Sequence, residues 1–280
     1  MSSIEEQMTA VYVFVDDYLK AHPQATQWRR ANNASPAFTD AEVITIGLLQ
    51  GCLGVATLKQ AYRFAAANLR PAFPRLPVYG QWLARLHALS GVLGQLLQAA
   101  GERAAAAEPF YILDSKPIPV CKPVRHGRVR LLREEGAYFG KNSVGWFFGF
   151  KLHVLIHASG ALLAAVLTPG NWADQDVAPA LASSTGGGIG LADLGYRGED
   201  LCMRVAEETG LVLVTPAAAA KNTPQRVLIS SVRERVETTF SSLWSQFVDR
   251  VLSRSWEGLW STLKLKMLHY NLRLAGLLSA

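Results

Sequence analysis

The chain has 280 residues, of which 50% are hydrophobic and 18% charged, so it can fill a core and is not disordered as a whole. Its net charge of +6 suits a polyanionic partner such as nucleic acid without requiring one. The three cysteines, Cys52, Cys121 and Cys202, are far apart in the sequence, which argues against a disulfide framework and a Cys-rich zinc site. The polar start MSSIEEQMTA is unlike a signal peptide and no apolar run would span a bilayer, so we expect a protein of the reducing cytosol.

The first hundred residues have the apolar spacing of helices. Thr39 and Glu42 have the spacing of a capping box ahead of the run VITIGLLQ, and the segment PAFPRLPVYG is broken by prolines. We place a domain boundary near residue 108, which gives a helical region over 1–108 and a second domain over 109–280. Helices are expected over 4–20, after Glu42, and over about 58–69 and 79–100.

Beyond the boundary the pattern changes to strands, which we expect at 110–114, 146–157 and 161–168. The last two are joined by Ala158-Ser159-Gly160, a sequence typical of a hairpin turn. The order that follows is a helix over 175–184, the strand IGLAD, a helix over 198–209, the strand LVLVTP and a long helix from about 230. Strands followed by alternating helices and strands predict an α/β domain with a mixed sheet flanked by helices.

Two of the predicted strands end on an aspartate. Asp114 follows the apolar residues 110–113, and Asp193 closes IGLAD just before Gly195 and Gly198, which allow a sharp turn. Aspartate is common where a strand turns into a loop, so either residue alone has an ordinary structural explanation. Two such strands favour a functional site, because sites form at the carboxyl ends of strands in α/β sheets.

A third acid, Glu237, lies at the edge of the apolar stripe of the last helix. Arg233 is four residues before it, so an ordinary surface ion pair explains Glu237 taken alone, and Glu234 is a rival in the same run. Three carboxylates brought together would need a cation, and hard oxygen ligands suit Mg²⁺ or Mn²⁺. Two such ions can activate a water and stabilise the leaving oxygen of a phosphodiester.

These segments, taken in order, resemble the DDE transposases of bacterial insertion sequences, most closely the insertion sequence 982 family. The first-Asp strand is ILDSKPIPVC, and the hairpin with its turn is WFFGFKLHVLIHASGALLAAVLTPGNWADQD. The second-Asp segment is LADLGYRGED, the final-Glu helix is RERVETTFSSL, and TDAEVITIGLL resembles the N-terminal helical region. The resemblance covers most of the chain.

The resemblance implies an RNase H-like catalytic domain in which Asp114, Asp193 and Glu237 bind two Mg²⁺ or Mn²⁺ ions. It implies a DNA transposase of the bacterial cytosol that cuts the ends of its element by hydrolysis and joins the freed 3′-hydroxyls to target DNA. The region 1–108 would bind the DNA ends or dimerise, and the chain would act on DNA as a homodimer.

Three positions depart from the pattern of related groups. Ser230 and Trp244 replace a tyrosine and a lysine that flank the Arg–Glu pair in neighbouring groups, and Leu194 stands where lysine is common. None of these is an implied metal ligand, so the departures concern how DNA is gripped near the site.

Basic residues near the acids are candidates for contacts with DNA. Lys151 and His153 alternate with apolar residues, so they share one strand face that lies either near the scissile phosphate or in solvent. Residues 122–133 form a basic loop that predicts salt-dependent DNA binding, although a loop without a partner is the alternative. The expected DNA contacts are Lys122, Arg125, Arg128, Arg130, Lys151, His153, Arg197 and Arg233.

Four residues near the expected site have competing interpretations. Trp172 either stacks on an unpaired base or packs against the protein. Asp174, Asp176 and Asp200 are further acids, and helix capping is an adequate explanation for them.

Three other functions stay open at this point. A related nuclease would cut DNA without joining it, and a DNA-binding remnant would keep the fold without catalysis, although the three acids argue against the remnant. A phosphatase with Asp114 as nucleophile needs a second acid two residues on, where Lys116 stands.

Overall fold

The computed structural model describes residues 3–26, 36–142, 144–215, 237–243, 245–246 and 251–278. The chain divides into two compact units, one formed by residues 1–103 with 257–280 and the other by residues 104–256. The first unit therefore includes the end of the chain, which the sequence analysis places in the second domain. Among the residues described, no helix is long and apolar enough to cross a membrane.

The first unit is entirely helical in its described part. Its elements are α1 (Ile4–Ala21), η1 (Pro23–Thr26), α2 (Asp40–Cys52), α3 (Leu58–Asn68), α4 (Tyr79–Ala88), α5 (Ser90–Ala104) and α9 (Trp256–Leu274). Helix α2 begins with the predicted capping box, since the Thr39 N–H donates to Glu42 Oε2 and the Glu42 N–H donates to Thr39 Oγ1. The helix expected over 79–100 is two helices, α4 and α5, with Leu89 between them.

Helix α9 belongs to this unit because its apolar side chains pack in the core of the unit and its polar side chains form hydrogen bonds there. Leu265, Leu268 and Leu272 join the core that α1 to α5 build. Lys264 Nζ donates to the Ser90 carbonyl at 2.7 Å, and Asn271 Nδ2 donates to the Leu97 carbonyl at 3.0 Å. Such contacts between residues far apart in sequence leave no local pattern.

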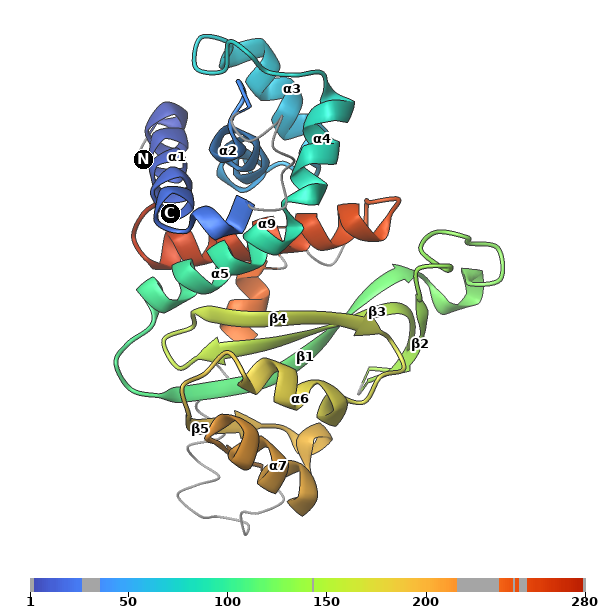
Figure 1. Ribbon diagram of the computed structural model, residues 1–280. Coiled ribbons are helices and arrows are strands. Elements are labelled where there is room, and N and C mark those ends of the chain that lie inside the picture. Colours follow the sequence, from blue (N-terminus) through green and yellow to red (C-terminus); the bar gives the residue numbers. More distant parts are fainter. Residues whose placement is uncertain are drawn as a thin grey trace. The chain divides into compact units, whose positions relative to one another are not determined.

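The second unit is built on a mixed sheet (Figure 1). Its strands are β1 (Phe110–Cys121), β2 (Tyr138–Lys141), β3 (Trp146–His157), β4 (Leu162–Pro169), β5 (Gly188–Ala192) and β6 (Leu211–Val214). The order is β2-β3-β1-β5-β6, and β4 also pairs with β3. Strands β1 to β4 pair antiparallel, whereas β5 runs parallel to both β1 and β6.

Helices cover one face of this sheet. Helix α6 (Asp174–Ala182) supplies Val177 and Leu181, and α7 (Glu199–Thr209) supplies Leu201 and Val205, to a core shared with Leu113 and other strand residues. The sequence therefore predicted the mixed sheet flanked by helices correctly, and the arrangement is compatible with an RNase H-like fold. The short strand β2 was not expected.

Strand β1 continues well past the expected end at residue 114, in spite of two prolines. Its pairing with β3 extends to Cys121, but its pairing with β5 stops at Leu113. Among the described strands, β1 pairs only with β3 at Pro117 and Pro119, so the missing N–H groups of these prolines cost no hydrogen bond to β5. The sheet opens between β1 and β5 directly after Leu113.

Candidate active site

The two predicted aspartates lie at this opening, on neighbouring strands. Leu113 of β1 pairs with Ala192, the last residue of β5, in parallel register; Asp114 follows Leu113 within β1, and Asp193 follows directly after β5. Adjacent strands are about 4.8 Å apart. The two acids are thus brought side by side by strands that are separated by almost eighty residues of sequence.

Backbone N–H groups orient both carboxylates. The Ser115 N–H donates to Asp114 Oδ1 at 2.7 Å. Asp193 caps the short helix η4 (Leu194–Tyr196), since its Oδ1 accepts from the Gly195 N–H at 2.7 Å. Each of these bonds fixes the direction of one carboxylate oxygen.

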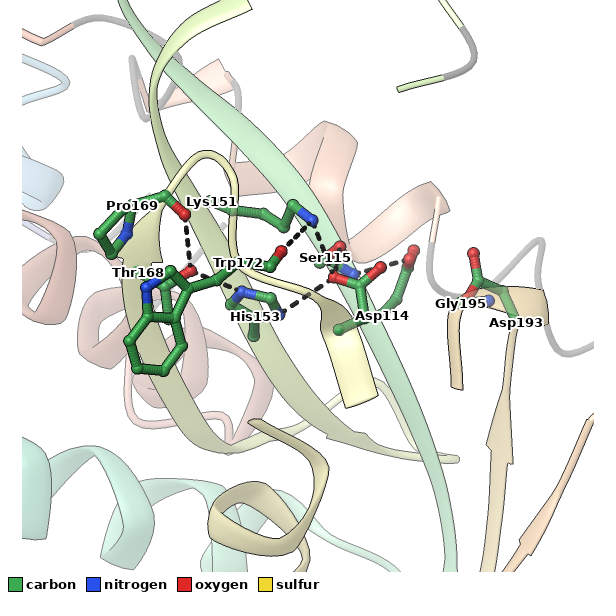
Figure 2. A network of polar contacts seen from close by, with 10 residues as sticks. Asp114, Ser115, Lys151, His153, Thr168, Pro169, Trp172, Asp193 and Gly195 are labelled. Atoms are coloured by element: carbon green, nitrogen blue, oxygen red, sulfur yellow. Dashed lines mark hydrogen bonds and ion pairs between the residues drawn. The ribbon is translucent and has the colours of Figure 1, made fainter. Parts of the chain in front are cut away.

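A third carboxylate, Asp174 at the start of α6, lies beside these two. Its Oδ1 accepts from Ser115 Oγ at 2.9 Å and from Lys151 Nζ at 3.2 Å, and it lies 3.4 Å from His153 Nδ1. Figure 2 shows Ser115 of β1 and Lys151 and His153 of β3 turned toward one another, with Asp193 and Gly195 just past the end of β5. The N-cap of α6 is Ala173, so the capping explanation for Asp174 was wrong.

The side chains of Lys151 and His153 are enclosed rather than solvated. Lys151 is 14% exposed and His153 is 0% exposed, so the alternative of a solvent-facing strand was wrong. Lys151 also donates to the Trp172 carbonyl at 2.9 Å. The His153 side chain is completely buried in the absence of DNA, so its expected contact with DNA stays a prediction.

His153 is neutral near pH 7. Burial lowers its pKa to about 4, against the opposing effect of Asp174 and with a smaller contribution from Lys151. Its Nε2 lies 2.9 Å from the Thr168 hydroxyl. Thr168 Oγ1 in turn donates to the Pro169 carbonyl at 3.2 Å, so Nε2–H of His153 donates to Thr168, and Nδ1 lies 3.4 Å from Asp174 without a hydrogen bond to a described residue.

The charges of all three carboxylates affect the pKa of Tyr196. Its side chain is completely buried, and its hydroxyl has no hydrogen-bond partner in the described part of the chain. Burial, followed by the charges of Asp174, Asp114 and Asp193, raises the pKa of Tyr196 well above its ordinary value. The hydroxyl therefore keeps its proton at neutral pH and faces a region of negative potential.

Glu237 stands at the start of the described part of the last predicted helix, which is helical over 237–243. Its side chain is exposed, whereas Phe240 and Leu243 are buried as the apolar stripe predicted. Lys116 Nζ lies 5.3 Å from the centre of the Phe240 ring, so this helix packs near the part of β1 that follows Asp114. The described residues do not include four other residues discussed for this segment: Ser230, Arg233, Glu234 and Trp244.

The residues present suit a divalent cation of the Mg²⁺ type. No group of three His, Cys, Asp or Glu side chains within the described ranges is arranged to hold a metal ion. Mg²⁺, however, is commonly bound by one or two carboxylates together with water and substrate phosphates. Asp114 and Asp193 supply hard oxygen donors at adjacent positions. The buried Tyr196 hydroxyl, which has no partner among the described residues, is near enough for both charges to affect its pKa.

The expected DNA contacts of the segment 122–133 are on the surface. Lys122, Arg125, Arg128 and Arg130 are exposed, and none of them has a side-chain ion pair or hydrogen bond to another described residue. His126 anchors the segment, because its ring packs on Phe139 and Phe148 with centroids 4.6 and 5.8 Å away. Arg197, after η4, is also exposed.

Three other residues of the sequence analysis lie near helix starts. Trp172 is 46% exposed, so its ring is not simply a core residue. Asp176 and Asp200 are exposed in the first turns of α6 and α7, where a negative charge suits the helix dipole.

Sequence reasoning undervalued Asp174 and missed Ser115 and Tyr196. A signal for Asp174 was present, because Lys151 and His153 share one strand face and a buried lysine needs a counter-charge. Ser115 and Tyr196 offered no such signal, since their importance depends on which face of the sheet α6 covers.

The fold and the site thus define an α/β protein with paired carboxylates at the open end of two parallel strands. Residues 104–246 match the protein family described as Transposase DDE domain. The chain belongs to this family of DDE transposases. No curated protein and no solved structure gives a significant match to the chain.

Proposed function

We propose that this DDE transposase cuts the ends of its element by metal-assisted hydrolysis and joins the freed 3′-hydroxyls to target DNA by transesterification. The observation that carries the proposal is the adjacent placement of Asp114 and Asp193 at the opening of the sheet. It lies within the stretch that matches the transposase family. Membership of a subgroup such as the insertion sequence 982 family is part of the proposal.

In this proposal Asp114, Asp193 and Glu237 hold two Mg²⁺ or Mn²⁺ ions. Such ions, when bound, activate a hydroxyl nucleophile and stabilise the leaving oxygen of a phosphodiester. The chain's own residues orient the carboxylates, since the N–H groups of Ser115 and Gly195 fix Asp114 and Asp193 before DNA arrives. Because the carboxylates are already oriented, they do not have to be rearranged when the DNA reacts.

The exposed cations Lys122, Arg125, Arg128 and Arg130 would bind phosphates of the DNA beside the site. Arg197 would contribute from the Asp193 side and Arg233 from the last helix. Lys151 acts within the site through Asp174 rather than on the surface. Stacking of Trp172 on an unpaired base stays one of its two interpretations, and its exposed ring is compatible with it.

For the helical unit, we propose that α3 contacts the DNA ends. Leu58, Ala61 and Ala65 of α3 are buried, while Lys59 and Arg63 are exposed on its other side. Arg70 and Arg75 are exposed just after it, and no Asp or Glu occurs between residues 43 and 101. Helix α2 cannot play this part, because ten of its thirteen residues are buried.

The test of α3 separates DNA binding from dimerisation, its alternative role. Arg63→Glu reverses an exposed charge and should abolish binding of the chain to its own element's ends without changing the oligomeric state measured by light scattering. A variant that binds DNA normally but changes its oligomeric state would support the dimerisation role instead. Homodimer formation on DNA is itself part of the proposal.

The function is tested by strand cleavage and joining on labelled DNA that carries the element's own ends, with Mg²⁺, Mn²⁺ or EDTA. Asp114→Ala, Asp193→Ala and Glu237→Ala should each abolish both steps, whereas Glu234→Ala should keep them. Cutting without joining would support the nuclease, and DNA binding without cutting would support the inactive remnant. Loss of activity in Glu234→Ala alone would reassign the third acid.

A further inference from the structure

Asp174 lies in the site, but neither the family match nor the expected catalytic acids explain its position. Asp174 uses a single oxygen, Oδ1, for all three of its partners on β1 and β3. Ser115, one of these partners, is also the residue whose N–H fixes Asp114. Asp174 is therefore linked to the first catalytic acid through a single residue.

The other oxygen of Asp174 faces the second catalytic acid. A Cβ atom added at Gly195 would lie 2.7 Å from Asp174 Oδ2 and 2.9 Å from Asp193 Oδ1. The two carboxylates thus approach the same point beside Gly195 from different elements. Gly195 does not adopt a positive φ, so a larger residue here would be opposed by the nearby carboxylates and not by backbone strain.

We propose that Asp174 is a positioning residue of the DDE site, which holds the Asp114 strand through the hydrogen bond of Oδ1 with Ser115 and places Oδ2 beside Gly195 in the Asp193 turn. It also neutralises Lys151, whose charge would otherwise oppose the binding of a divalent cation nearby. The inference rests on the proposed function, in that Asp114 and Asp193 are taken as the residues that hold the cation.

The Tyr196 hydroxyl is independent support for a ligand at this place. It is completely buried, has no partner among the described residues, and lies close enough to Asp174, Asp114 and Asp193 to be influenced by all three charges. A buried hydroxyl without a hydrogen-bond partner is unfavourable, so such a group in a native structure needs an explanation. Hydrogen bonding to water or ligand atoms held by the carboxylates would satisfy it.

The experiment measures Mn²⁺ binding by the full chain without DNA, from the loss of the electron paramagnetic resonance signal of free Mn²⁺. Asp174→Ala should bind Mn²⁺ about tenfold more weakly, since groups that orient metal ligands contribute about 10- to 100-fold to affinity. Asp176→Ala is the matched control, because it removes an exposed acid from the same helix turn, and it should bind as the wild type does.

Two double variants separate positioning from direct coordination. Lys151→Met added to Asp174→Ala should restore part of the affinity, because it removes the uncompensated cation. Gly195→Ala should weaken binding by itself, and its effect should be smaller when Asp174 is alanine, because one of the two close contacts has then gone.

Several results would overturn the inference. Equal affinity of Asp174→Ala and Asp176→Ala would show that Asp174 has no part in the site. A loss that Lys151→Met does not relieve would make Asp174 a direct ligand. If Asp174→Ala does not fold, as judged by circular dichroism, Asp174→Asn takes its place; it keeps an acceptor for Ser115 and loses the charge that balances Lys151.

The proposed function can fail separately. Asp114→Asn and Asp193→Asn should each remove most Mn²⁺ binding, and if they do not, the assignment of the metal-holding acids is wrong whatever Asp174 does. If the wild type binds no Mn²⁺, both the metal site and the inference are refuted.

Discussion

The basic segment after β1 gives a prediction whose size follows from the structure. Lys122, Arg125, Arg128 and Arg130 are exposed and free of described side-chain partners, so each is available to a phosphate. Each phosphate contact contributes about 0.9 to the slope of log K against log salt, so replacing all four residues with glutamine should reduce the slope by up to about 3.6. Over the range from about 50 to 200 mM salt, the wild type should therefore lose roughly 100-fold more affinity than the variant.

The assay is fluorescence anisotropy of a labelled duplex of arbitrary sequence, measured at several NaCl concentrations. Arbitrary DNA suffices because phosphate contacts do not depend on sequence. Arg133→Gln is a control from the same segment, since Arg133 donates to the His126 carbonyl and lies 5.8 Å from the Phe148 ring centre. Arg133→Gln should change the slope by less than the replacement of one arginine that lacks such partners. An unchanged slope in the quadruple variant would refute DNA binding by this segment.

The remaining predictions concern stability. Burial, with a smaller effect of Arg273, lowers the pKa of His269 from 6.5 to about 4, so between these pH values only the unfolded state holds the proton. Stability should be full above pH 6.5 and fall by about 3 kcal/mol as the pH drops toward 4, and His269→Gln should remove that part of the pH dependence of urea unfolding. Gly149 has φ of 158° and its added Cβ would lie 2.3 Å from the Ile118 carbonyl, so Gly149→Ala should cost about 2 kcal/mol or more in thermal unfolding. A Cβ atom added at Gly127 would meet no atom within 4 Å, so Gly127→Ala should hardly change the stability. An equal loss of stability in both variants would contradict this reasoning.

The local patterns in the sequence were sufficient for the framework of the fold. Alternating apolar residues located β3 and β4, and the sequence Ala158-Ser159-Gly160 located their turn, because these depend on neighbouring residues. The capping box at Thr39 is equally local. The strands that end on Asp114 and Asp193 were also predicted, and the order of elements then required a mixed sheet.

Local patterns failed where partners are remote in sequence. The prolines of β1 suggested an early end to the strand, but the absence of β5 beyond Leu113 makes them acceptable. Helix α9 was assigned to the wrong unit because its hydrogen bonds reach back to α5, across 174 residues.

The candidate site shows the same division. The sequence determined that two aspartates follow apolar strands and that a basic segment follows the first of them. Only the tertiary structure decided that the two strands are parallel neighbours in register, which brings Asp114 and Asp193 together. It also decided that α6 covers the face of Ser115, Lys151 and His153, so that Asp174 is a buried partner rather than a helix cap. The reason is physical, because burial and close charge depend on which elements pack together, and that is set by the whole core.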